Sequence, residues 1–212
     1  MNHNPHIIEQ CYRMPDDDEW LRIDPGAAVV GQADSIAERY TDTRHARKGL
    51  AEAIVKLNRQ AMRTGAGDAY AWVPDRRSGE PVIYGYPGKV VFDTAEEATA
   101  EAYAAKDPST FVTPGNRIVG YHAALVQRPA GPSVVTSAIL RENSTTTTCN
   151  LVMSITFPQV VGLREALSLA MFTYHSDMDD KASHFISMVA NSLGIQVQLP
   201  DNSIVTVGPW EE

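Results

Sequence analysis

Hydrophobic and polar residues alternate regularly between residues 145 and 157. Successive side chains of a β-strand point to opposite sides, so this period of two residues predicts a strand. One side carries mostly apolar residues, and the other carries mainly threonine, serine and asparagine. We therefore predict that the first side is buried, with the residues Thr145, Thr147, Cys149, Leu151, Met153, Ile155 and Phe157.

The pattern becomes helical between residues 176 and 193. Apolar residues there fall within an arc of about 100° at 3.6 residues per turn. Ser176 and Asp179 form an imperfect capping box at the start, and Gly194 suits the end of the helix. We expect the apolar side to pack in the core, with the residues Met178, Ala182, Phe185, Ile186, Val189 and Leu193.

Two further stretches favour helix. Residues 33–63 predict two consecutive helices, because the segment 41–43 interrupts the apolar pattern and offers a new N-cap. Residues 93–106 predict another helix, capped by Asp93 and Thr94. Its acidic residues lie in the first turns, where the helix dipole favours negative charge.

Runs of β-like residues account for most of the remaining chain, at 20–25, 70–73, 81–86, 117–127 and 133–140. A polar turn separates 70–73 from 81–86, so these two runs predict a hairpin. Residues 165–172 are ambiguous, since their Leu, Ala, Glu and Met favour helix while the nearby Gly162 leaves room for a hairpin partner. We expect a strand at 165–172, with a helix as the alternative.

The charge of the chain restricts its partners. The 212 residues include 18 Lys and Arg against 26 Asp and Glu, which gives a net charge of −8. A broad cationic surface for nucleic acid is therefore not expected. Hydrophobic residues make up 43% of the chain, enough for a globular core.

Nothing in the sequence indicates a membrane or an oxidising compartment. The first ten residues lack a basic segment followed by an apolar one, and no stretch reaches about 18 uninterrupted apolar residues. Cys11 and Cys149 belong to no metal-binding or disulfide pattern. We expect a cytoplasmic protein that associates with no membrane.

Residues 175–184 contain two His and several Asp, whose nitrogen and oxygen atoms suit zinc, iron or manganese. However, Asp180 and His184 project from the helix side opposite the apolar stripe, where no enclosing cavity is expected. We therefore expect a solvated polar face and no metal. No glycine-rich phosphate loop or nucleophile motif occurs, so we expect no cofactor and assign no catalytic residue.

Two features are candidates for binding. The second predicted helix concentrates positive charge, from which Arg44, Arg47, Lys48 and Arg59 are candidate contacts for an acidic protein partner. An ordinary solvated helix face is the alternative, and no aromatic residues are interleaved to stack nucleic-acid bases. Trp210, near the C-terminus, is a candidate interface anchor, unless the tail folds back and packs it on its own domain.

Several segments, taken in order, resemble small α+β proteins of unknown function found in actinobacteria, whose fold is similar to the PsbP-type α/β/α sandwich. The matching segments are 15–25, 127–131, 134–137, 154–158, 172–174 and 185–193. The resemblance implies an antiparallel sheet with helices packed on its faces, used as a binding or assembly module. It covers residues 15–195 as one domain, with an extension at 1–14 and a tail at 196–212. Residues 204–207 in that tail are expected to add an edge strand or to contact a partner.

Two classes of function follow from these observations. The first is a non-enzymatic module of a bacterial cytoplasmic system that binds a protein partner or itself. The second is an enzyme whose site assembles only in three dimensions, from His122, His175, Asp177 and His184. A cavity that encloses two of these residues together with a group of strongly shifted pKa would favour the enzyme. A sheet face fully covered by helices, with no such cavity, would favour the binding module.

Overall fold

The computed structural model of the chain describes residues 4–14, 18–108, 116–142 and 148–210. Two antiparallel sheets and four α-helices account for most of these residues. The strands are β1 (His6–Cys11), β2 (Trp20–Ile23), β3 (Ala69–Trp72), β4 (Ile83–Val91), β5 (Asn116–Arg128), β6 (Gly131–Glu142), β7 (Thr148–Thr156), β8 (Glu165–Thr173), β9 (Gly194–Gln198) and β10 (Ile204–Val207). The helices are α1 (Ala27–Glu38), α2 (Arg44–Thr64), α3 (Ala100–Ala104) and α4 (Asp179–Asn191), the last preceded by a short 3-10 turn at Ser176–Met178.

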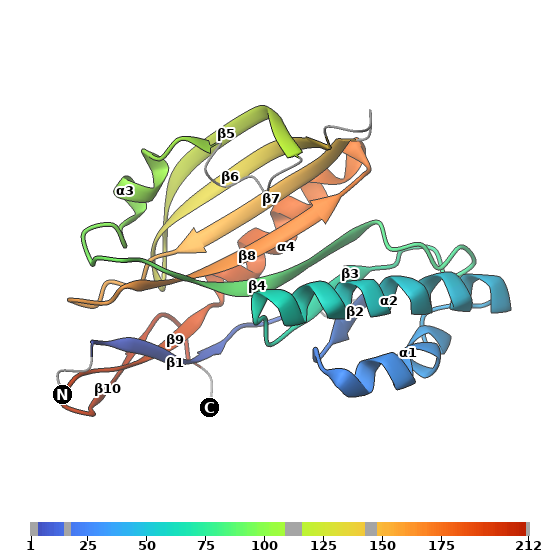
Figure 1. Cartoon of the computed structure of the whole chain (residues 1–212), viewed down its shortest axis with the longest axis horizontal. Coiled ribbons are helices and arrows are strands. Elements are labelled where there is room, and N and C mark those ends of the chain that lie inside the picture. The colour runs from blue at the N-terminus through green and yellow to red at the C-terminus, as the bar shows by residue number, and fades with distance from the viewer. Residues whose placement is uncertain (1–3, 15–17, 109–115, 143–147, 211–212) are drawn as a thin grey trace.

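Seven strands form the main sheet in the order β2-β3-β4-β8-β7-β6-β5. Every neighbouring pair is antiparallel, and helices pack on both faces (Figure 1). The expected α+β class is thus confirmed, as are the hairpin of β3 and β4 and the strand at 165–172. The β8 strand lies between β4 and β7, so a late segment of the chain forms the middle of the sheet.

Helix α4 covers one face of the main sheet. Its apolar stripe is buried as predicted, with Phe185 only 1% exposed and its ring stacked on Trp20 at 4.1 Å between centroids. Val152, Leu169 and Met171 meet this stripe from β7 and β8. This side of the sheet therefore has a continuous core, to which α4 contributes the outer layer.

Helices α1 and α2 pack over the β2–β4 end of the opposite face. Leu50 and Ile54 of α2 are buried in one cluster with Ala71 of β3. The predicted break between the two helices is confirmed, since Thr43 Oγ1 accepts a hydrogen bond from the Ala46 amide at 3.1 Å. No helix within the described residues is both long and apolar enough to cross a membrane.

The predicted helix at 93–106 is wrong in length and in its cap. Only Ala100–Ala104 is α-helical, and Thr99 rather than Asp93 or Thr94 caps it, accepting from the Ala102 amide at 3.2 Å. The reason is tertiary, because Phe92 and Tyr103 both pack against Phe157 on the sheet. These anchors hold the segment against the sheet, and residues 93–99 form turns and bends before the short helix.

The predicted burial of β7 also requires correction. Cys149, Leu151 and Met153 are only half-buried, whereas Val152 and Ser154 on the other side are 3% and 2% exposed. The register places Val152 beside Met171, directly beneath α4, so the helix covers the side that carries more polar residues. Ile155 and Phe157 are buried as expected, and Thr145 and Thr147 lie outside the described residues.

The two segments set apart as extension and tail meet in a small second sheet of order β1-β9-β10. Ile7, Ile195 and Val197 form its core together with Leu163 and Leu167. Residues 204–207 form the edge strand β10, one of the two expectations for the tail. Whether residues 15–195 form a domain by themselves stays a prediction.

Candidate functional site

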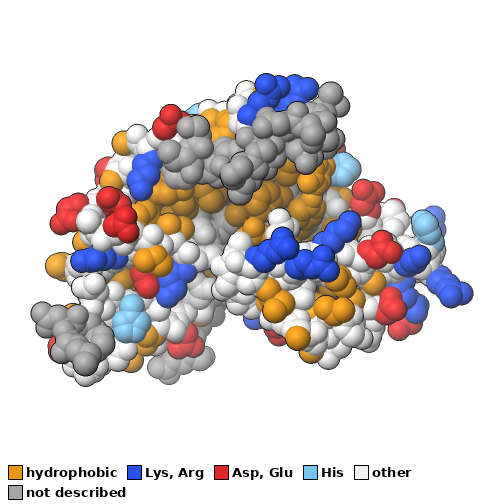
Figure 2. Space-filling view, in the orientation of Figure 1, with side chains coloured by type: hydrophobic (Ala, Val, Ile, Leu, Met, Phe, Trp, Pro, Cys, Tyr) orange, Lys and Arg blue, Asp and Glu red, His pale blue; other side chains and the backbone are white. Residues whose placement is uncertain are grey.

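On the face opposite α4, no helix of the described ranges covers the middle of the main sheet. We call this surface the open face and define it by Tyr84, Tyr86, Cys149, Leu151, Met153, Phe172 and Tyr174. Figure 2 shows it as a hollow of hydrophobic side chains, with Lys and Arg along the rim over α2. Within the described chain, α3 covers one end of this sheet face and α2 the other.

Strand register brings the open face together from distant parts of the sequence. Phe172 of β8 lies opposite Leu151 of β7 and opposite Tyr84 of β4. Directly opposed residues of antiparallel strands point to the same side of a sheet. The side chains of Tyr84, Leu151 and Phe172 therefore share one surface. Tyr86 of β4 belongs to it too, because its ring lies beside that of Phe172.

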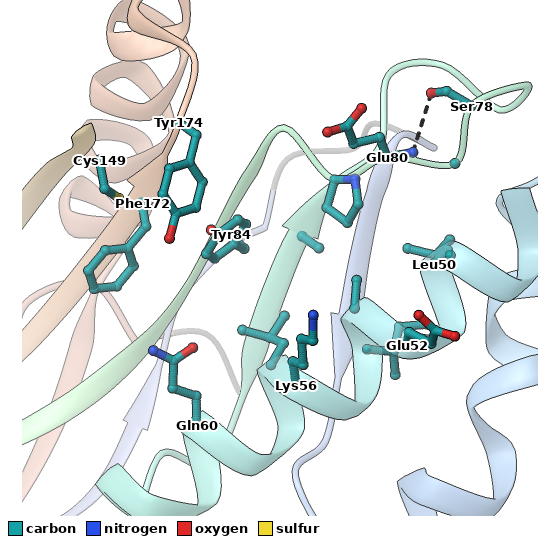
Figure 3. Close-up of a pocket in the computed structure, with 17 residues that line it drawn as sticks. Leu50, Glu52, Lys56, Gln60, Ser78, Glu80, Tyr84, Cys149, Phe172 and Tyr174 are labelled. Atoms are coloured by element: carbon teal, nitrogen blue, oxygen red, sulfur yellow. Dashed lines mark hydrogen bonds between the residues drawn. The ribbon is translucent and has the colours of Figure 1, made fainter. Parts of the chain in front are cut away.

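Where the open face meets α2, it deepens into a cavity of about 580 Å³. Tyr84, Phe172, Tyr174 and Cys149 line the cavity on the sheet side. Residues of α2 form the facing wall (Figure 3). A volume of several hundred Å³ with an apolar floor and few polar groups is typical of a binding site. The α2 wall and the adjoining turn contribute the residues Gly49, Leu50, Glu52, Ala53, Ile54, Lys56, Leu57, Gln60, Ser78, Gly79, Glu80 and Pro81.

Three aromatic rings form a connected cluster in this cavity. The Tyr84 and Phe172 rings are stacked at 6.4 Å between centroids and 23° between planes. The Tyr84 and Tyr174 rings are 6.1 Å apart and tilted by 43°. Tyr174 is 57% exposed, so part of the cluster faces solvent. Exposed aromatic surface of this kind binds apolar groups well, since it loses little conformational freedom on contact.

The polar groups on the sheet side of the cavity are held in their neutral forms. Burial raises the pKa of the Tyr84 hydroxyl, and hydrogen bonding with Tyr174 raises it further. Burial also raises the pKa of the Cys149 thiol to about 11, although a backbone hydrogen bond from Thr173 opposes the shift. Near pH 7 these groups are hydrogen-bond donors without charge, so the sheet side presents an uncharged surface.

The charge of the cavity comes from its α2 side. Lys56 and Gln60 extend from α2 toward the strands (Figure 3), and both are exposed. Lys56 forms no ion pair with any described residue. Glu52 and Glu80 also line the cavity. Apolar contact at the floor can thus be combined with polar or charged contacts at the rim.

The predicted cationic residues lie away from this cavity. Arg44 and Lys48 are exposed on α2, and Arg47 pairs with Glu38 of α1 at 2.8 Å. Arg59 borders a separate recess between α1 and α2. Trp210 is half-buried after β10. Binding roles for Arg44, Arg47, Lys48, Arg59 and Trp210 stay predictions.

The four residues of the enzyme alternative do not converge on this cavity. His122, His175, Asp177 and His184 are all exposed, and none of them lines it. His184 lies on the solvent side of α4, as its helical position predicts. No three His, Cys, Asp or Glu side chains gather as metal ligands anywhere in the described ranges. The expectation that the native protein holds no metal or cofactor stays a prediction.

Sequence reasoning missed the open face, although it contained part of the signal. The alternation in β7 identifies Cys149, Leu151 and Met153 as one surface. The alternation of Tyr84 and Tyr86 in the predicted hairpin gives a second surface. What the sequence does not show is that β8 lies between them, with Phe172 facing the same side.

Comparisons with known proteins give likenesses of shape among solved structures. No protein-family model matches the chain, and no curated protein matches it. Among solved structures, the fold is similar to LpqN of Mycobacterium tuberculosis, described as involved in cell envelope biogenesis. The TM-score is 0.49 at 8% sequence identity, over 90% of each chain. This likeness identifies neither a family nor a function, and the PsbP-type resemblance stays a prediction.

Proposed function

We propose that this chain is a non-enzymatic binding module whose open face receives an apolar segment of a protein partner. The observation that carries the proposal is the half-buried state of Tyr84, Leu151, Met153 and Phe172 on the central strands of the sheet. Central strands of a folded domain normally bury both faces or expose a polar one. An apolar surface left uncovered there is typical of an interaction site.

The shape of the surface favours a polypeptide partner. On the opposite face, α4 supplies a helical layer above Val152, Leu169 and Met171. The open face has α2 at one end and α3 at the other, with the apolar floor running between them. An amphipathic segment laid across this gap would complete the layer, as helices do when they bind in apolar grooves.

The charges at the cavity support a segment with polar residues along its edges. Lys56 provides a positive group beside the aromatic cluster, and Glu52 and Glu80 provide negative ones. A partner residue of either sign therefore finds a complementary group at the rim. The enzyme alternative has less support, because its four residues are exposed and lie outside the cavity.

Site-specific photocrosslinking in the native host tests the proposal. A photoreactive amino acid replaces Tyr174, which is 57% exposed beside the aromatic cluster, and in a control it replaces Val161, which is 97% exposed in the loop after β7. We expect a covalent adduct of discrete protein mass from position 174 alone. The adduct should disappear when Phe172→Asp is added, while circular dichroism shows that the variant still folds.

Four results would contradict the proposal. Position 174 could give no protein adduct, or position 161 could give the same adduct in equal yield. Position 174 could instead give an adduct of a few hundred daltons, which would identify a small molecule as the occupant. An adduct that survives Phe172→Asp would also place the contact outside the open face.

A further inference from the structure

The two edges of the main sheet differ in how well they are protected from pairing with a further strand. The β2 edge has four residues, including the exposed Arg22, and the chain turns away at Asp24 and Pro25. The β5 edge has 13 residues, and among the described strands only β6 pairs with it. Its other side therefore presents a row of backbone donors and acceptors along the longest strand of the sheet.

Strand β5 has few of the devices that usually prevent pairing at an edge, and its two charged residues, Arg117 and Arg128, lie near its ends. Between residues 116 and 128 there is no Pro, Lys, Asp or Glu. Val119 and Leu125 are 50% and 54% exposed, although both are large apolar residues. The one irregularity in its pairing with β6 lies between Ile118 and Gly120, near one end. A long, apolar edge of this kind is expected to bind another strand.

The sequence of β5 is complementary to itself in the antiparallel direction. If two copies of β5 lie antiparallel with His122 opposite His122, each residue before His122 faces a compatible residue that follows His122 in the other copy. Tyr121 would lie opposite Ala123, Gly120 opposite Ala124, Val119 opposite Leu125 and Ile118 opposite Val126. Large residues thus meet small or apolar ones, which is the favourable arrangement for cross-strand pairs.

We propose that two copies of this chain associate by antiparallel pairing of β5 with itself, about a two-fold axis at His122. A two-fold axis makes the same surface of both copies meet, so one self-complementary strand is sufficient. The charges agree with this register. Arg117 would meet Gln127, and the Arg128 guanidinium is turned toward α4, where it donates to Asn191 Oδ1 at 2.6 Å.

The pairing has a defined geometry. A two-fold axis normal to the sheet keeps each open face on the same side, so the two main sheets would continue into one. Directly opposite residues of antiparallel strands have Cα atoms about 4.5 to 5.5 Å apart, which is within the range for a disulfide. Ser137 of β6 pairs with His122 of β5, so Ser137 lies one strand further from the two-fold axis than His122 does. Two Ser137 residues would be about 14 Å apart at the usual strand spacing.

Cysteine crosslinking in the full chain tests this register. Cys11 and Cys149 are replaced by Ser, and His122→Cys or Ser137→Cys is then introduced as a matched pair of exposed positions. After mild oxidation with diamide, we expect a covalent dimer from position 122 and at least tenfold less from position 137. Sedimentation of the unmodified protein should give twice 23.2 kDa at tens of micromolar.

A charge substitution supplies the second measurement. Leu125→Lys should shift the sedimenting species to the monomer, because two added charges would lie near the pairing edge. Val161→Lys, at a site 97% exposed elsewhere, should leave the dimer unchanged. The proposal is wrong if the unmodified protein is monomeric at 100 μM, if position 137 crosslinks as well as position 122, or if Leu125→Lys leaves the dimer intact. None of these results depends on what binds the open face.

Discussion

Both faces of the main sheet carry apolar side chains, but these side chains are exposed to different extents on the two faces. Under α4, Leu169 and Met171 of β8 are 6% and 0% exposed. On the open face, Phe172 of the same strand is only half-buried. Among the residues that the structure describes, the difference is the presence of a covering helix on one face, since the alternating residues of one strand supply both surfaces. An apolar pattern alone therefore does not tell a core from a binding surface.

On the covered face, α4 completes the helical layer and adds contacts to the sheet. Phe185 stacks on Trp20, and Lys181 lies over the Trp72 ring at 4.5 Å. The Trp72 indole donates to Glu19 Oε2 at 2.8 Å, so this large ring has its polar atom satisfied. On the open face, no described helix covers the aromatic cluster. We interpret it as a layer that a partner completes.

The largest effect is expected on the covered face. Phe185→Ala should lower the free energy of unfolding by about 3 to 5 kcal/mol, because it removes a large, fully buried side chain and leaves a cavity. Denaturant unfolding followed by circular dichroism measures the change. A loss below about 1 kcal/mol would show that α4 does not seal this face.

The second prediction concerns the reactivity of Cys149. Burial raises its pKa from 9.0 to about 11, so the folded protein at pH 8 should react with iodoacetamide up to roughly a hundredfold more slowly than the unfolded chain. The rate should keep rising with pH up to about 11. Because the unfolded chain loses this proton first, the same shift should weaken folding as pH rises from 9.0 through about 11. A Cys11→Ser variant isolates the signal, and a rate that levels off near pH 9 would argue against a buried thiol.

A smaller effect is expected from the matched substitution on the open face. Phe172→Ala should lower the free energy of unfolding by only about 1 kcal/mol, since the half-buried ring already contacts water. The same denaturant experiment compares it with Phe185→Ala. Equal losses for the two phenylalanines would mean that both faces are sealed and that the open face is core.

The smallest effect is expected at His184, on the solvent side of α4. His184→Ala should change the free energy of unfolding by less than about 0.5 kcal/mol, as exposed positions usually do. Because His184 directly precedes Phe185, the two variants together test the rotation of the helix. A loss above about 2 kcal/mol at His184 would show that the side chain has a structural role.

Local periodicity was sufficient for most elements and insufficient for their arrangement. The stripe on α4 could be predicted because Ala182, Phe185 and Val189 recur at helical spacing. The structure of the segment 93–106 could not be predicted in this way. Phe92 and Tyr103 hold it against Phe157, which comes more than fifty residues later. The open face depends on β8 pairing with β7, the preceding strand, and also with β4, which is a long-range pairing that leaves no local signal.

Solvent access to two methionines tests the contrast between the faces most directly. Met153 of β7 lies half-buried on the open face, whereas Met171 of the adjacent β8 lies under α4 and is 0% exposed. Methyl NMR in the presence of a soluble nitroxide should broaden the Met153 signal severalfold more than the Met171 signal. Equal protection of both methyl groups would contradict the account, because the face proposed for a partner would then be closed.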